Sequence, residues 1–369
     1  MQGLTAIAVG LIGLAVGFAC GFTVQRARLC TFGAVEDALV GGNWRRLKAF
    51  GLSLALAILG VQALVAFLGF DPGTTTYVPA RIALAGTLVG AVLFGLGMAL
   101  VGTCAFGSLV RLGTGDLRSL VTLLIFAVLA YAVLRGVLAG VRIDMVEAVA
   151  LSLPAGSIGA YPDLMAAWLG PLARHVTGPL VAVLLLAVAL RDQRLRRSPR
   201  LLTAAVVLGL GVVAGWAVTG PLADPFAAEI RVQSLTFVAP VARALFTIVT
   251  GEGMLLDFGV MTVFGVIAGA ATAAFVGREF RWEAFDDQRE MRRHLAGAAL
   301  MGAGGVLAGG CTIGQGLTAG SLLALSWPVA VIGMVVGARI GIAILLEGSP
   351  IEWLRALTRR GGGQRSPAE

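Results

Sequence analysis

Long uncharged segments alternate with short charged segments along this chain. Residues 295–338, for example, contain no charged side chain. A helix needs about 20 mainly apolar residues to cross the hydrocarbon core of a bilayer, so such segments are candidates for membrane-spanning helices. The pattern predicts about nine of them, at residues 4–24, 48–69, 82–103, 119–140, 176–190, 201–219, 255–277, 294–310 and 326–346.

The apolar segments lack the alternation typical of barrel strands, and only helices and closed barrels satisfy their backbone hydrogen bonds in lipid. Composition agrees, because 58% of the residues are hydrophobic and 13% are charged, whereas soluble domains average about 45–50% and about 25%. We therefore predict an all-α integral membrane protein that is embedded in a lipid bilayer. It has a single transmembrane domain, residues 1–346, and a cytoplasmic tail, residues 347–369.

The net charge of +8 comes from basic side chains that are concentrated in short loops. They cluster at residues 26–48, at residues 191–200 and in the tail. Short loops rich in Lys and Arg stay on the cytoplasmic side of a membrane. The distribution predicts an outside N-terminus and a cytoplasmic C-terminus. It indicates that the positive charge orients the chain in the membrane rather than binding nucleic acid.

The sequence around Cys104 recurs around Cys311. Both segments read GxGxxLxGxCxxGxxxxxG without a gap. Glycine is common in this chain, with 52 residues, but there are only 4 cysteines. We infer an internal pseudo-twofold repeat around a central pathway lined by cysteines. Its halves are residues 1–140 and 201–346, joined by an outer segment at 141–175 and a basic loop at 191–200.

A weaker similarity pairs residues 13–26 with residues 265–278. In the predicted topology the helices that carry the two cysteine motifs are antiparallel, as an inverted repeat requires. The helices that carry the weaker match are instead parallel. Whether the repeat is inverted throughout therefore stays open at this point.

Matched interruptions of apolar segments in two halves are the best sequence indication of a transport site near the bilayer midplane. Glycines allow a helix to break there, and the N-termini of the half-helices attract anions. Close helix packing would also favour glycine, but it would not require a cysteine. The residues expected to support the site are Gly102, Gly107, Gly309, Gly310, Gly314 and Gln315.

Cys30 lies in a third interrupted segment, which we predict to be a re-entrant half-helix at residues 30–42. Basic and polar side chains precede it and Arg111 follows Cys104; these either guide an anion or anchor the chain at the interface. Cys20 has no break beside it and fits a packing residue. The candidate pathway thiols are Cys30, Cys104 and Cys311, and the candidate anion-guiding residues are Gln25, Arg26, Arg28 and Arg111.

A buried thiol away from positive charge stays protonated, and a neutral thiol is a weak donor that does not repel an anion. This suits the passage of a soft, sulfur-containing anion, since a conducting site must bind weakly. A soft-metal transporter is an alternative, although the chain has only His175 and His294 and lacks a CxxC pair. A membrane thiol–disulfide oxidoreductase is the other alternative. We expect a transporter without metal or cofactor rather than an enzyme.

The segments "QRARLC", "GMALVGTCAFGSLVRLG" and "GGVLAGGCTIGQGL" resemble the signature segments of the YeeE/YedE sulfur transport family. The resemblance implies uptake of thiosulfate through the inner membrane of a bacterium, with Cys30, Cys104 and Cys311 relaying the ion. It also implies a small cytosolic sulfur-carrier protein of the TusA type as a partner. Other members of this family transport other sulfur or selenium compounds, and Cys20 lies outside the family pattern.

Overall fold

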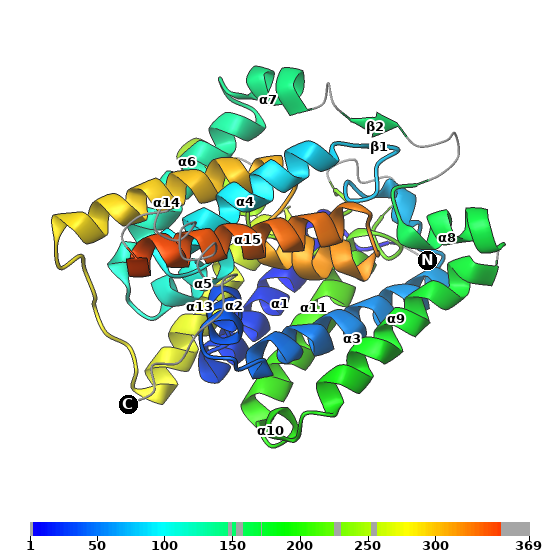
Figure 1. Cartoon of the computed structure of the whole chain (residues 1–369), viewed down its shortest axis with the longest axis horizontal. Helices are drawn as coiled ribbons and strands as arrows, with labels where there is room; N and C mark the ends of the chain where they lie inside the picture. The colour runs from blue at the N-terminus through cyan, green and yellow to red at the C-terminus, as the bar shows by residue number, and fades with distance from the viewer. Residues whose placement is uncertain are drawn as a thin grey trace, which may run out of the picture.

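The structure is a computed structural model that describes residues 3–146, 150–152, 158–170, 172–224, 230–251 and 257–347. Apart from residue 347, the predicted tail lies outside these residues. The described chain is a bundle of helices with one short antiparallel strand pair, β1 (Arg81–Ile82) and β2 (Leu151–Ser152) (Figure 1). The prediction of an all-α membrane protein is therefore confirmed.

Two groups of helices, at the two ends of the chain, follow the same order of long, short, long, long, short and long. The first group is α1 (Ala6–Ala27), α2 (Thr31–Leu39), α3 (Arg45–Leu68), α4 (Leu84–Val101), α5 (Ala105–Gly113) and α6 (Leu117–Leu134). The second is α11 (Pro199–Thr219), α12 (Ala239–Thr250), α13 (Phe258–Gly277), α14 (Gln288–Leu307), the π-helical η4 (Gly314–Ala319) and α15 (Ser326–Glu347).

Shorter elements connect these groups. The 3-10 turn η1 (Pro72–Thr74) follows α3, and four helices follow α6: α7 (Ala139–Val146), α8 (Tyr161–Leu169), α9 (Leu172–Leu190) and α10 (Gln193–Arg196). Helix α9 runs along α3 at the edge of the bundle (Figure 1). The ion pair between Lys48 and Asp192 ties the end of α9 to the start of α3, with Nζ and Oδ2 2.8 Å apart.

Eight helical segments in the described part of the chain are long and apolar enough to cross a membrane. They coincide with eight of the predicted spans. The remaining prediction, residues 294–310, corresponds to α14, which begins earlier. Its first turns carry Glu290, Arg292 and Arg293, so its apolar part is shorter than that of the eight spanning segments.

Helices α1 and α13 run parallel and in close contact. Gly13, Gly17 and Gly21 face Phe258, Thr262 and Val266 in order, and a Cβ at Gly17 would lie 2.3 Å from the Thr262 carbonyl oxygen. Small residues let membrane helices approach in this way. The weak match of residues 13–26 with 265–278 thus falls on parallel neighbours.

The antiparallel relation that an inverted repeat requires occurs in two other pairs. Helix α1 is antiparallel to α11, since Leu4 pairs with Ala223 while Cys20 lies against Gly211. Helix α4 is likewise antiparallel to α14, because Gly90 lies near Ala308 and the later Gly97 lies near Gly297. This is the pair that carries the two cysteine motifs.

Candidate functional site

Each of the three candidate thiols stands directly before a short helix and is followed three residues later by glycine, in the segments CTFG, CAFG and CTIG. Cys30 and Cys104 are the N-cap residues of α2 and α5. Cys311 directly precedes the helical residues that begin at 312. The sequence therefore repeats one local structure three times, with a sulfur at the N-terminus of a helix.

Glycine three residues after the cysteine brings a backbone N–H to the sulfur. Gly107 N–H donates to Cys104 Sγ at 3.4 Å, and Gly314 N–H donates to Cys311 Sγ at 3.3 Å. A side chain at either glycine would displace a polar neighbour. An added Cβ would lie 2.1 Å from Thr103 Oγ1 at Gly107 and 2.5 Å from Thr236 Oγ1 at Gly314.

The Cys30 and Cys104 thiols lie beside each other. Each also meets a hydroxyl from the other segment: Cys104 Sγ lies 3.8 Å from Thr31 Oγ1, and Cys30 Sγ lies 3.6 Å from Thr103 Oγ1. Cys104 is completely buried, whereas Cys30 borders a cavity. We call these two thiols, together with the two hydroxyls beside them, the thiol pair.

Cys311, also completely buried, has different surroundings. Backbone amides of Ile313 and Phe237 face its sulfur in addition to that of Gly314. The Tyr77 hydroxyl lies nearby, beside the Thr236 hydroxyl, and burial raises the pKa of this phenol above its ordinary value. It is therefore a neutral hydroxyl at neutral pH. Together these groups form what we call the amide cradle.

Thr312 connects the two regions. It follows Cys311 directly in the chain, and its side chain lies beside the Cys104 thiol. Its buried hydroxyl has no hydrogen-bond partner within the described residues. The same is true of the Gln315 side-chain oxygen, while the Gln315 amide nitrogen donates to the Ala308 carbonyl at 2.7 Å. Buried polar atoms without partners are uncommon in proteins, so these two positions stand out.

Two cavities lie at opposite ends of α4, and thus toward opposite faces of the protein. One, of about 520 Å³, is lined by Cys30, Thr103 and Arg111, near the end of α4. The other, of about 350 Å³, is lined by Tyr77 and Gln315, together with Ala83 and Thr87 from the start of the same helix. The thiol pair therefore borders one cavity, and the amide cradle lies beside the other.

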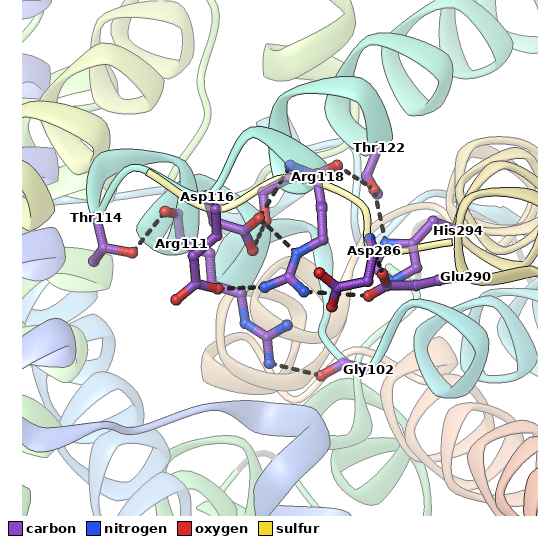
Figure 2. Close-up of polar contacts among 11 residues, drawn as sticks. Gly102, Arg111, Thr114, Asp116, Arg118, Thr122, Asp286, Glu290 and His294 are labelled. Carbon is purple, nitrogen blue, oxygen red and sulfur yellow. Dashed lines mark hydrogen bonds and ion pairs between the residues drawn. The ribbon is translucent and has the colours of Figure 1, made fainter. Parts of the chain in front are cut away.

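The structure brings three of the four predicted anion-guiding residues to the larger cavity. Arg28 forms an ion pair with Glu279 at 2.9 Å, and the Gln25 amide lies 3.5 Å from the same carboxylate. Arg111 donates to the Gly102 carbonyl at 3.1 Å (Figure 2). Arg26 instead lies over the Phe22 ring and lines a separate surface pocket.

The predicted glycines have distinct local roles. Gly102 and Gly309 end their helices with φ angles of 77° and 74°, which a residue with a side chain adopts only with strain. Gly310 packs against the backbone of Gln315. Gly102 and Gly309 lie two residues before their cysteines, and Gly310 lies one residue before Cys311. They allow each long helix to end just before its cysteine, so that a second helix can begin there.

A charged cluster lies at the start of α6 (Figure 2). The Arg118 guanidinium binds Asp116 at 3.0 Å and Glu290 at 3.2 Å, and it also binds Glu283. Glu283 itself lines the cavity. The cluster thereby fixes the segment between α13 and α14 against the start of α6.

The sequence reasoning missed the hydroxyl partners of the thiols. Thr31 and Thr312 each directly follow a pathway cysteine, and Thr103 directly precedes one. This adjacency at all three thiols was the available signal, along with the glycine three positions later. Tyr77 and Thr236 come from distant segments and carry no comparable signal. No cluster of three or more His, Cys, Asp or Glu side chains suited to a metal occurs among the described residues.

Comparison with known proteins gives these features a context. The sequence profile of a family described as "Sulphur transport" matches residues 26–340. Thiosulfate transporter TsuA of Escherichia coli strain K12 is 30% identical over 350 residues, which cover 89% of this chain and 92% of that protein. Thiosulfate transporter TsuA of Spirochaeta thermophila is 27% identical over 88% of this chain and 96% of its own.

A shorter match is to the probable transporter YedE of Escherichia coli strain K12, which is 31% identical over 31% of this chain and 27% of that protein. All of these relatives are named as transporters, which points to transport rather than enzymatic catalysis. The family profile covers most of the chain and includes all three cysteine segments. The chain is therefore a multi-pass membrane protein that belongs to the sulphur transport family.

Proposed function

We propose that this protein takes up thiosulfate, or a closely related sulfur anion, across a bacterial inner membrane. The ion passes from the smaller cavity to Cys311, then to Cys104 and Cys30, and leaves through the larger cavity. One observation carries this proposal: the amide cradle, Thr312 and the thiol pair lie in series between two cavities at opposite ends of α4. The names of the TsuA relatives support thiosulfate as the substrate.

Weak contacts suit such a path. A protonated thiol donates a weak hydrogen bond, and the terminal sulfur of thiosulfate is a soft, polarisable acceptor. The hydroxyl of Thr312, which has no hydrogen-bond partner in the described part of the chain, adds a donor between the two regions. Backbone N–H groups at a helix start also favour an anion. Because each contact is weak, the ion is held without being trapped.

The direction follows from charge. Basic side chains crowd the face on which the larger cavity opens, including Arg28, Arg111 and the loop at residues 191–200. Positive loops remain in the cytoplasm, so this face is cytoplasmic and the N-terminus lies outside. A small cytosolic sulfur carrier of the TusA type would then receive the ion at the larger cavity.

Uptake of labelled thiosulfate into proteoliposomes tests the proposal. Wild-type protein is expected to take up the label, with sulfate and selenium analogues tested in parallel for specificity. Cys311→Ala is expected to lower the rate of uptake about a hundredfold. Cys20→Ala is the matched control, since Cys20 is a buried thiol that packs beside Gly211, outside the site. Full activity of Cys311→Ala in correctly folded protein would refute the pathway.

The contact between Cys30 and Cys104 also fits the second candidate, a thiol–disulfide oxidoreductase. That function requires a disulfide to form and break in each cycle. Rapid alkylation of free thiols during thiosulfate uptake separates the two functions. Transport through neutral thiols leaves both cysteines reduced throughout, and stoichiometric oxidation during turnover favours the oxidoreductase.

A further inference from the structure

A third cavity, of about 360 Å³, lies between α3, α9 and α15 and reaches inward to α2 and the helix that follows Cys311. We call it the lateral groove. Its lining is apolar except for a few side chains, among them Lys48, Thr31 and Thr312. A buried water requires two to four polar partners, which most of this surface does not offer. An apolar occupant fits the lining better than water does.

Two glycines in the lateral groove have a property that close packing does not explain. An added Cβ at Gly51 of α3 or at Gly316 of η4 would meet no atom within 4 Å, and neither has a positive φ. Elsewhere in the bundle, as at Gly17 or Gly95, an added Cβ would clash with a neighbouring backbone. At Gly51 and Gly316 the missing side chain leaves space for something other than this chain.

The surroundings identify the occupant. The walls of the groove come from α9 and α15, which expose large apolar side chains such as Leu184 at 63% and Ile332 at 60%, as expected of helices in contact with hydrocarbon. At one end of the groove lie Lys48 and the half-exposed Trp44. Lys and Trp at the end of a membrane helix mark the headgroup region. We propose that the lateral groove binds one acyl chain of a bilayer phospholipid, with its headgroup beside Trp44 and Lys48.

The location gives this lipid a role in the pathway. Thr31 and Thr312 line the groove and also neighbour the Cys104 thiol. The acyl chain thus packs against the two threonines that separate Cys104 from the groove. The proposal that the groove binds a lipid does not depend on which ion is transported. The proposal that this lipid influences passage of the ion past Cys104 rests on the proposed function.

A phosphatidylglycerol that carries a photoactivatable diazirine in one acyl chain, placed in vesicles with the full-length protein, tests the binding. Peptide mapping is expected to find the label on the groove side of α9 and α15. Gly51→Trp fills the groove and is expected to lower this labelling about tenfold, the equivalent of about 1.4 kcal/mol. Gly316→Leu fills it from the opposite wall. Gly140→Trp is the matched control, because a Cβ at Gly140 also meets no atom within 4 Å but lies outside the groove.

Thermal unfolding of each variant verifies that the fold is retained. Equal labelling of Gly51→Trp and wild type, or labelling of wild type only outside the groove, overturns the proposal. The same labelling experiment on Cys311→Ala separates lipid binding in the groove from ion transport past the thiols. That variant has lost most of its uptake if the pathway is correct, yet it is expected to retain the lipid, so failure of one proposal is not failure of the other.

Discussion

The motifs around Cys104 and Cys311 share a local arrangement, a sulfur at the start of a helix with glycine three residues later. They differ in the groups that surround the sulfur. At Cys104 the sulfur accepts the Gly107 N–H, and its other neighbours are side chains: a second thiol and the hydroxyls of Thr31 and Thr312. At Cys311 they are mainly backbone amides, from Gly314, Ile313 and Phe237. The comparison teaches that a repeated sequence motif fixes where a sulfur sits, whereas the segment packed against it decides what the sulfur can do.

The order of the helices explains the difference. In the first half a short helix that begins at Cys30 lies between α1 and α3, and the corresponding place between α11 and α13 holds α12, preceded by Thr236 and Phe237. The Cys30 thiol at one end of the proposed pathway is thus matched by the Thr236 hydroxyl and the Phe237 N–H at the other end. We infer that the amide cradle selects the anion and that the thiol pair releases it.

Removing either motif thiol is expected to have the largest effect. Cys104→Ala and Cys311→Ala should each lower the initial rate of thiosulfate uptake about a hundredfold, the equivalent of about 2.7 kcal/mol in barrier height. Labelling of Cys30 by a membrane-impermeant thiol reagent should persist in Cys311→Ala, because Cys30 borders its own cavity. Loss of that labelling would mean that the two regions do not act separately.

Oxidative cross-linking distinguishes the two regions next. A mild oxidant is expected to join Cys30 to Cys104, whose thiols lie beside each other, and to leave Cys311 free. Peptide mapping identifies the product, and a reductant should restore the uptake that the disulfide blocks. A Cys104–Cys311 disulfide as the main product would contradict the arrangement.

Substitutions at the paired glycines test the shared backbone. Gly107→Ala and Gly314→Ala each place a Cβ within 2.5 Å of a threonine hydroxyl, so each must shift a group that lies beside a sulfur. Uptake is expected to fall about tenfold in both, the equivalent of about 1.4 kcal/mol. Gly140→Ala, where a Cβ meets open space, provides the control. Unchanged uptake in both variants would show that the close packing of these glycines against the threonine hydroxyls is not needed for transport.

The smallest effects come from single hydroxyls. Tyr77→Phe removes a donor from the amide cradle and Thr103→Val removes one from the thiol pair. Loss of one hydrogen bond costs about 0.5–1.5 kcal/mol. We expect the first to raise the substrate concentration for half-maximal uptake about threefold and the second to lower the maximal rate by a similar factor. Concentration dependence of uptake measures both, and the reverse pattern would exchange the two roles.

Much of the membrane architecture followed from hydrophobicity, because lipid imposes length and apolarity on every spanning helix. The three cysteines were prominent because each interrupts an apolar segment. The relation between the helices was harder to predict: glycine spacing in α1 and α13 resembles a repeat, although it reflects the needs of two parallel helices in contact. Contacts such as Tyr77 with Thr236 depend on how distant segments pack, and local sequence does not encode them.

The close pairing of α1 with α13 also constrains how the protein is made. The glycine face of α1 has its partner about 245 residues further along the chain. At roughly 5–20 residues per second of synthesis, the first helix waits on the order of 10 to 50 seconds before that partner emerges from the ribosome. During this interval the insertion machinery or surrounding lipid must cover the helix, so assembly of the bundle is completed only after translation is nearly finished.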